Sequence, residues 1–162
     1  MRYSQIRNLD IANGPGCRIS IFCSGCEHKC KSCFNPETWN FDHGPEFTED
    51  TLQSLLDLAE PSYISGLSIL GGEPLHPRNR EEVIRLVKKF KEKYPDKTIW
   101  VWTGYLWEEV ASDLVDSEID VVVDGRFIEE LKDLRLKYRG SSNQRVIDVQ
   151  ASLKNNNITL YE

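Results

Sequence analysis

Three cysteines in one short segment constrain this chain more than any other feature of its sequence. Cys26, Cys30 and Cys33 are separated by three and then two residues, directly after the apolar run 19–22. Thiolates this close together are well placed to hold one compact centre of a soft metal. In a four-iron cluster, three cysteines leave one iron without a protein thiolate, and that iron can bind a substrate. The spacing therefore favours a catalytic iron–sulfur cluster over one that only stores electrons.

A structural zinc site is the main alternative for the same segment. It would use Cys23 together with Cys26, Cys30 and Cys33. Zinc modules usually separate their ligand pairs by a dozen or more residues, whereas the inner gap here is three residues. A bacterial ferredoxin sequence has gaps of two, two and three residues and a proline after its last cysteine, which this chain does not match. The cluster interpretation is preferred, and zinc stays as the alternative.

The other cysteines and the histidines are expected to be structural. Cys17 and Cys23 lie on the apolar face of a predicted strand, so we expect both in the core, with a redox role for Cys23 as the alternative. His28 stands between the candidate ligands and is expected to face solvent. His43 and His76 lie in predicted loops and are expected to be structural or solvated.

Composition and charge limit the kinds of protein that this chain can be. Its 162 residues fit one domain, residues 1–162, with a real core and little room for a second domain. A net charge of −6 argues against a broad nucleic-acid surface. The first residues lack the apolar stretch of a signal peptide, and no segment approaches the roughly 20 apolar residues of a membrane span. We therefore expect a cytoplasmic protein with reduced cysteines, bound neither to nucleic acid nor to a membrane.

Apolar, β-rich runs alternate with helical patterns along the chain. Strands are predicted at residues 17–23, 66–70, 98–102, 119–123 and 145–149. Helices are predicted after Thr48, with Leu52, Leu55, Leu56 and Ala59 on the apolar face, at about 79–93, and around 106–114. Such alternation is typical of right-handed βαβ units with a mainly parallel sheet. At roughly 30 residues per unit, against about 250 for a closed barrel, the predicted fold class is α/β: a partial, open parallel βα barrel of about five units.

Three unusual segments begin where predicted strands end, at residues 71–74, 103–104 and 124–127. Because parallel α/β sheets bind ligands at the carboxyl ends of their strands, we expect these segments and the cysteine loop to share one edge. Gly71 and Gly72 allow backbone carbonyls to approach a ligand closely, and Glu73 offers an acceptor for an ammonium group. Arg126 suits a carboxylate through its bidentate fork. The structural alternatives are a tight turn with a solvated glutamate and an arginine that faces water.

Several blocks of the sequence resemble known families. Cys26-x3-Cys30-x2-Cys33 resembles the signature of the radical S-adenosylmethionine superfamily, and Gly71-Gly72-Glu73-Pro74 resembles its methionine-amine-binding motif. Residues 13–18 resemble the opening of glycyl-radical-enzyme activases. Residues 33–39, 100–105, 123–127 and 139–145 resemble the activating proteins of anaerobic ribonucleoside-triphosphate reductase. Phe34 stands where many members carry tyrosine and Glu73 where some carry aspartate, and both changes are conservative.

The resemblance implies a pair of cofactors and a reaction. The three cysteines would hold a 4Fe-4S cluster, and the amine and carboxylate of S-adenosylmethionine would chelate its fourth iron. An electron from a flavodoxin-like or other low-potential reductant would split the sulfonium into methionine and a 5′-deoxyadenosyl radical. That radical would remove a hydrogen atom from a glycine on the large subunit of the reductase. The implied function is that of a glycyl-radical-enzyme activase.

The resemblance also implies which other residues contact S-adenosylmethionine. The backbone of Ser32, Cys33 and Phe34 would contact the adenosyl part. Gly71-Gly72-Glu73-Pro74 would receive the ammonium, and Arg126 would pair with the carboxylate. No side chain is implied as a catalytic acid or base. Two alternatives stay open: another small radical enzyme, acting on a different glycyl-radical enzyme or on a small molecule, and a zinc-stabilised interaction module without catalysis.

Overall fold

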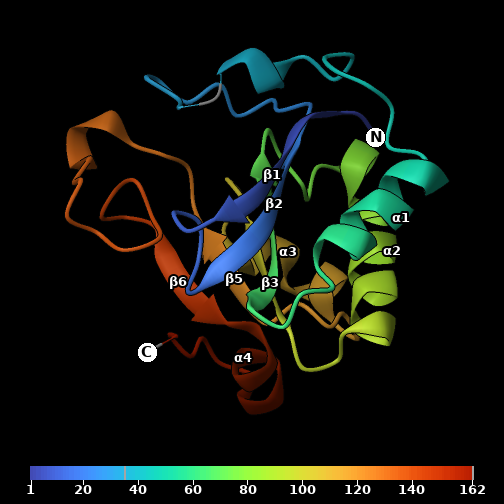
Figure 1. The fold of residues 1–162 in the computed structure, drawn as a ribbon. Helices are drawn as coiled ribbons and strands as arrows, with labels where there is room; N and C mark the ends of the chain where they lie inside the picture. Colours follow the sequence, from blue (N-terminus) through green and yellow to red (C-terminus); the bar gives the residue numbers. More distant parts are fainter. Residues whose placement is uncertain (35, 162) are drawn as a thin grey trace.

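The computed structural model of the chain describes residues 1–34 and 36–161. They fold around one six-stranded mixed sheet (Figure 1). Asn35, which belongs to the block 33–39, and Glu162 lie outside the described residues. The strands are β1 (Tyr3–Asp10), β2 (Cys17–Cys23), β3 (Ile64–Gly71), β4 (Thr98–Trp102), β5 (Val121–Asp124) and β6 (Arg145–Asp148). The α-helices are α1 (Glu49–Leu58), α2 (Pro77–Lys93), α3 (Trp107–Val110) and α4 (Val149–Asn155). The short 3-10 helices are η1 (Pro36–Trp39), η2 (Ala111–Leu114) and η3 (Glu129–Leu131).

The strands lie in the sheet in the order of the sequence, from β1 to β6. Strands β2 to β5 pair in parallel, whereas β1 and β6 pair antiparallel at the two edges. The α/β class is therefore confirmed, but the expectation of about five βα units is wrong. Within the described residues, three parallel connections pass through α1, α2 and α3. Residues 125–144 form no long helix, so β6 returns beside β5 as an antiparallel partner.

The two longest helices begin at residues that cap them. Thr48 precedes α1, as predicted: its hydroxyl accepts the N–H of Thr51 at 3.2 Å, and the Thr51 hydroxyl accepts the N–H of Thr48 at 3.2 Å. His76 precedes α2, and its Nδ1 accepts the N–H of Arg78 at 3.1 Å. Pro77 suits the first helical position because the missing N–H has no partner there. The structural role expected for His76 is thus confirmed. None of the described helices combines the length and the apolar character needed to cross a lipid bilayer.

One strand and one α-helix were not predicted because their sequences hide the usual pattern. β1 is an edge strand in which Asp10 alone is buried, so its polar residues obscure the alternation that marks a strand. α4 follows β6 immediately, and Asp148 caps it by accepting the N–H of Ala151 at 3.0 Å. The predicted strand 145–149 therefore ends one residue early. The helix predicted at 106–114 is divided between α3 and η2.

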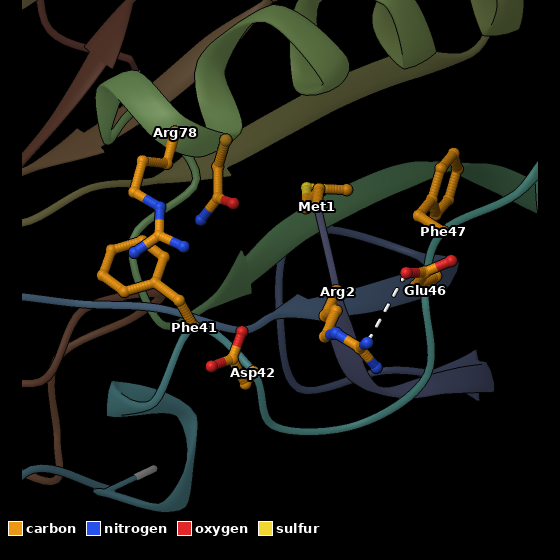
Figure 2. Close-up of a pocket in the computed structure, with 8 residues that line it drawn as sticks. Met1, Arg2, Phe41, Asp42, Glu46, Phe47 and Arg78 are labelled. Atoms are coloured by element: carbon orange, nitrogen blue, oxygen red, sulfur yellow. Dashed lines mark hydrogen bonds and ion pairs between the residues drawn. The ribbon is translucent and has the colours of Figure 1, made fainter.

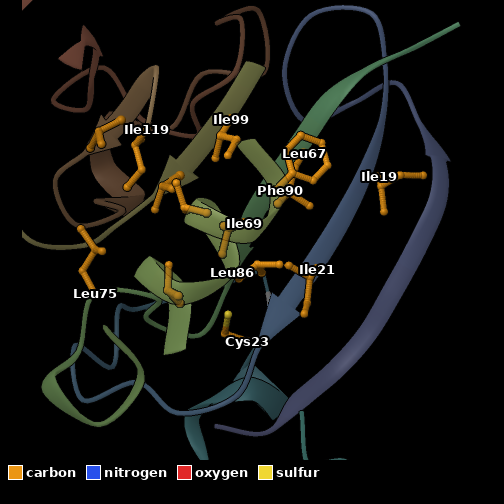
Figure 3. Close-up of a cluster of buried hydrophobic side chains, with 14 of the residues drawn as sticks. Ile19, Ile21, Cys23, Leu67, Ile69, Leu75, Leu86, Phe90, Ile99 and Ile119 are labelled. Carbon is orange, nitrogen blue, oxygen red and sulfur yellow. The ribbon is translucent and has the colours of Figure 1, made fainter. Parts of the chain in front are cut away.

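The two faces of the sheet have different coverings. One face packs against α1 and α2 and forms the main core (Figures 1 and 3). Its buried strand residues are Ile19, Ile21, Cys23, Ile64, Leu67, Ile69, Ile99, Val101, Val122 and Ile147. Cys23 is fully buried in this core and Cys17 packs against it, so the core packing predicted for both is confirmed. The alternate residues, among them Ser20, Ser68 and Trp100, lie on the opposite face in register with one another.

A buried arginine occupies the opposite face near the amino ends of the parallel strands. Arg18 is fully buried, and burial lowers its pKa to about 10. Its guanidinium donates to the Ser68 hydroxyl at 2.8 Å, to the Thr98 carbonyl at 2.9 Å and to the Thr98 hydroxyl at 3.0 Å. These contacts join β2, β3 and β4 at the end of the sheet opposite to the cysteine loop. Arg18 therefore stabilises the sheet rather than binding a ligand.

Asp10 anchors the end of β1 and gives a test of this fold. Burial opposes ionisation of its carboxylate, but hydrogen bonds from Ser20, Asn13 and Ala12 outweigh that effect and lower its pKa. At pH values above the pKa of the unfolded chain, about 3.9, the lowered pKa of the folded chain stabilises the fold. This contribution is lost as the pH falls through the pKa of the folded chain. Asp10→Asn is therefore expected to lower the free energy of unfolding by about 1–2 kcal/mol at pH 7, and by less in acid.

Urea unfolding of both chains at neutral and acidic pH measures this difference. The control is Asp50→Asn, which is exposed in the first turn of α1 and is expected to change stability by less than about 1 kcal/mol. A loss for Asp10→Asn that stays constant down to the acid limit would contradict the assigned role of the carboxylate.

Candidate iron–sulfur centre

The cysteine loop is joined to the turn after β3 by backbone hydrogen bonds. It leaves the carboxyl end of β2 and begins at Gly25, whose φ of +105° favours glycine. The N–H of Gly72 donates to the Cys23 carbonyl at 2.7 Å, and the N–H of Glu73 donates to the Gly25 carbonyl at 2.7 Å. The start of the loop is therefore fixed against the Gly-Gly-Glu turn without the use of any cysteine side chain.

The 3-10 helix η1 closes the other side of this turn. The N–H of Gly25 donates to the Thr38 carbonyl at 2.6 Å, and that of Cys26 donates to the Trp39 carbonyl at 3.1 Å. A Cβ on Gly72 would lie 2.6 Å from the Gly25 carbonyl oxygen and 2.7 Å from that of Thr38. Glycine is required at position 72 because three backbone segments meet there.

A cavity of about 600 Å³ opens where these loops meet. All three candidate ligands, Cys26, Cys30 and Cys33, line it. The ends of the other parallel strands contribute Gly71, Gly72, Thr103, Gly104, Gly125 and Phe127. The four features that were expected at one edge of the sheet therefore do converge on one space.

The three cysteines are suited to hold a cluster in this cavity. Each is partly buried. Burial raises the pKa of Cys26 to about 11, although the backbone N–H groups of His28 and Lys29 donate to its thiol and oppose the shift. Burial also raises the pKa of Cys30, against the N–H of Phe127 and the positive charge of Arg126. Backbone N–H groups that face cysteine sulfurs are a feature of iron–sulfur sites, so the residues fit such a cluster.

The described residues do not form a site for a single metal ion. Among residues 1–34 and 36–161, no three His, Cys, Asp or Glu side chains come together as one ion would require. The fourth thiol of the zinc alternative, Cys23, lies in the core, where burial raises its pKa to about 12. A four-iron cluster differs from a zinc ion in binding each cysteine through a different iron. The arrangement therefore suits a cluster better than it suits a four-cysteine zinc site.

The other predicted site residues lie around the cavity in different ways. Phe34 lines it, is exposed, and packs against Phe127 with ring centres 4.9 Å apart. Ser32 is exposed, and its hydroxyl donates to Glu129 of η3 at 2.8 Å. Arg126 is exposed beside the cysteine loop, and its carbonyl accepts from the Asn143 side chain at 2.8 Å. Ser32 and Arg126, like Glu73 and Pro74, are not among the residues that line the cavity.

Glu73 is buried among hydrogen-bond donors. Its Oε1 accepts from the N–H of Gly104 at 2.6 Å and lies 2.8 Å from His28 Nε2. Its Oε2 accepts from the Thr103 hydroxyl at 2.7 Å and from the N–H of Leu75 at 2.8 Å. The prediction that His28 faces solvent is therefore wrong, since its side chain is 7% exposed and bonded to Glu73.

The roles of two further residues near the site were not recognised from the sequence. Asn79 is buried and donates from Nδ2 to the carbonyls of Ser24 and Glu73, both at 3.0 Å. Asp124 is fully buried and accepts from Arg145 and from the N–H of Trp107. Apart from the contact of Asn79 with Glu73, these contacts join residues 17 or more positions apart, so no local pattern marks them. The only available signal was the position of each polar residue beside a predicted strand or at the start of a helix.

A second pocket lies away from the cysteines, beside the start of the chain (Figure 2). It has a volume of about 280 Å³. The Arg78 guanidinium lies 4.2 Å from the centre of the Phe41 ring, and Arg2 pairs with Glu46 at 3.5 Å. The first contact holds the segment before α1 against α2, and the second holds it against the start of the chain, so the pocket lies between packed surface segments.

Comparison with known proteins assigns the chain to a family. Residues 12–147 match the family described as "4Fe-4S single cluster domain". The activating protein of anaerobic ribonucleoside-triphosphate reductase from Enterobacteria phage T4 is 44% identical over 90% of this chain and 93% of its own length. The proteins of the same name from Salmonella typhi and Escherichia coli K12 are 44% and 43% identical, each over 90% of this chain and 97% of their own. The chain therefore belongs to the family of anaerobic ribonucleoside-triphosphate reductase-activating proteins.

Proposed function

We propose that this chain is a radical S-adenosylmethionine activase that installs a glycyl radical on an anaerobic ribonucleoside-triphosphate reductase. One observation carries the proposal: three cysteines of one loop and the Gly71-Gly72 turn line the same cavity, while Cys23 is turned into the core. Three thiolates would leave one iron of a 4Fe-4S cluster without a protein ligand, and the turn shares the cavity in which a ligand of that iron would have to bind. Membership of the family supports the same conclusion.

The residues have separate tasks in this proposal. Cys26, Cys30 and Cys33 hold the cluster. The turn Gly71-Gly72-Glu73-Pro74 receives the ammonium of S-adenosylmethionine, the backbone around Ser32, Cys33 and Phe34 contacts its adenosyl part, and Arg126 pairs with its carboxylate. When bound, the two cofactors supply a 5′-deoxyadenosyl radical that takes a hydrogen atom from a glycine of the reductase.

The surroundings of the cavity help to keep water away from this chemistry. Phe22, Leu70 and Trp102 line it from the sheet, and Phe34 and Phe127 close part of its rim with a ring contact. Apolar walls lower the local dielectric and exclude side reactions of a reactive species. Phe34 is still 58% exposed, so the cavity is open to a partner on that side.

A polypeptide substrate also fits the shape of the fold. We propose that the sheet serves as an incomplete barrel, in one domain that acts in the cytoplasm, and that the open side admits the glycine loop of the large reductase subunit. A flavodoxin-like or other low-potential protein would supply the electron. The small number of βα units supports this view, because three connections leave the barrel unclosed.

Anaerobic reconstitution with iron and sulfide, followed by reductant and S-adenosylmethionine, tests the function. The expected products are methionine and 5′-deoxyadenosine, and addition of the large reductase subunit is expected to give the electron paramagnetic resonance doublet of a glycyl radical. Deoxyadenosine without any protein-borne radical would instead point to a small-molecule substrate or a different partner. A colourless protein with tightly held zinc would refute the proposal.

A further inference from the structure

We propose that His28 is a positioning residue, which acts through Glu73 to hold the cysteine loop over the ends of β3 and β4. Its Nε2 lies 2.8 Å from Glu73 Oε1, and the two side chains are 7% and 1% exposed. This role deepens the proposed function, because the effect of His28 on the binding of S-adenosylmethionine rests on that function. The effect of His28 on the position of the cysteine loop is independent of the proposed function.

The charge state of Glu73 determines the direction of this hydrogen bond. Three donors besides His28 reach its two oxygens: the N–H groups of Leu75 and Gly104 and the Thr103 hydroxyl. A carboxylate surrounded in this way acts as an acceptor, so we assign the His28 hydrogen to Nε2, from where it is the fourth donor. A hydrogen bond to an ionised group is shorter and stronger than one between neutral groups.

Glu73 joins three segments that each follow a parallel strand. The donors are His28 from the loop after β2, Leu75 from the turn after β3, and Thr103 and Gly104 from the end of β4. With all four positions filled, a ligand ammonium can reach the carboxylate only by displacing a donor. Glu73 therefore acts on such a ligand through the backbone and the segments that it holds in place.

The His28 ring is fixed on two further sides. A Cβ on Gly104 would lie 2.5 Å from its Cδ2 and 2.7 Å from its Nε2, so the ring packs directly on a bare glycine. The Tyr105 ring meets it edge-on at 4.7 Å. Gly104→Ala must consequently move the ring, while it leaves the cysteines and Glu73 unchanged.

Iron binding and ligand binding should depend on this contact to different extents. The three cysteines belong to one loop, so they can still gather iron if the loop shifts as a unit. S-adenosylmethionine must reach the open iron and the Gly71-Gly72 turn together, so its affinity depends on the distance between the loop and the turn. Loss of residues that orient a metal site typically costs 10–100-fold in affinity or activity.

The test uses four variants of the reconstituted, full-length chain. His28→Leu and Gly104→Ala remove or displace the ring, His28→Gln keeps an N–H donor at a similar reach, and Lys31→Ala is the control, with an exposed side chain in the same loop. Hydrogen–deuterium exchange measures the exchange rates of the amides of residues 24–33 before iron is added. After reconstitution, the iron content is measured. The electron paramagnetic resonance spectrum of the reduced cluster then gives the dissociation constant for S-adenosylmethionine.

The expected result separates the variants into two groups. In His28→Leu and Gly104→Ala, the amides of residues 24–33 exchange faster than in the parent. Both variants keep about four irons, and their affinity for S-adenosylmethionine is lower by a factor of about ten or more. His28→Gln and Lys31→Ala remain close to the parent in all three measurements. Parent-like exchange and affinity in both His28→Leu and Gly104→Ala would overturn the proposal, as would loss of iron in both. If the parent itself fails to bind S-adenosylmethionine, the proposed function fails, and the exchange data alone decide the role of His28.

Discussion

Cys26→Ala is expected to give a folded chain that no longer assembles a four-iron cluster. The fold should survive because backbone hydrogen bonds of Gly25, Gly72 and Glu73 fix the start of the loop without the Cys26 thiol. The cluster should fail because two thiolates from the loop leave two irons without a protein ligand. After anaerobic reconstitution, the iron and sulfide contents are expected to fall from about four of each per chain to near zero. Formation of 5′-deoxyadenosine is expected to fall to background.

Cys17→Ala and Cys23→Ala are the matched controls for this loss. Cys17 lies at the amino end of β2 and Cys23 in the core, and neither lines the cavity. Both variants should keep a full cluster, with Cys23→Ala less stable by about 1–3 kcal/mol because it empties part of a packed core. A cluster that persists in Cys26→Ala, or that disappears in Cys23→Ala, would contradict the three-cysteine site.

Asp124→Ala is expected to cause a large loss of stability. The Asp124 carboxylate is fully buried and accepts from Arg145 Nε at 3.1 Å, from the N–H of Arg145 at 3.2 Å and from the N–H of Trp107 at 2.8 Å. It thereby ties the end of β5 to β6 and to the start of α3, and it raises the pKa of Arg145. Removing one partner of a fully buried ion pair costs about 3–5 kcal/mol, and the lower end is expected here because Arg145 is 33% exposed. The midpoint of thermal unfolding should fall by roughly 6–12 °C.

Glu108→Gln isolates the buried part of this interaction. Glu108 binds the same guanidinium at 2.7 Å, but its side chain is 55% exposed. An exposed pair contributes about 0–1 kcal/mol, so this variant should unfold close to the parent. Calorimetry or thermal circular dichroism of the two variants measures the contrast. Equal losses for Asp124→Ala and Glu108→Gln would show that burial does not set the strength of this pair.

The sequence predicted the centre of the fold better than its edges. Strands β2 to β5 are short apolar runs with glycine or charged turns behind them, and buried parallel strands have that composition. β1 is mostly exposed or half-buried, so nothing in its own pattern reveals its partner. The number of βα units was overestimated because chain length does not show that residues 125–144 form loops and one short 3-10 helix instead of an α-helix.

The site divides in a similar way between local and distant information. The cysteines and the Gly71-Gly72 turn are local motifs, and the convergence of strand ends follows from parallel pairing, so their shared cavity was predictable. The contact of His28 with Glu73 joins residues 45 positions apart and depends on the direction of two side chains. That direction is set by the bare surface of Gly104, which only the folded chain brings against the ring.

The alternation of residues along the central strands gives a rule for engineering this chain. Even-numbered Phe22, Leu70 and Trp102 border the cavity, whereas odd-numbered residues beside them, such as Ile21 and Ile69, pack under the helices. A combinatorial library limited to these three cavity-bordering positions would alter the lining of the cavity and leave the layer under the helices unchanged. A library that also included the neighbouring core residues would yield mainly insoluble clones, because those changes would fall in the packed layer.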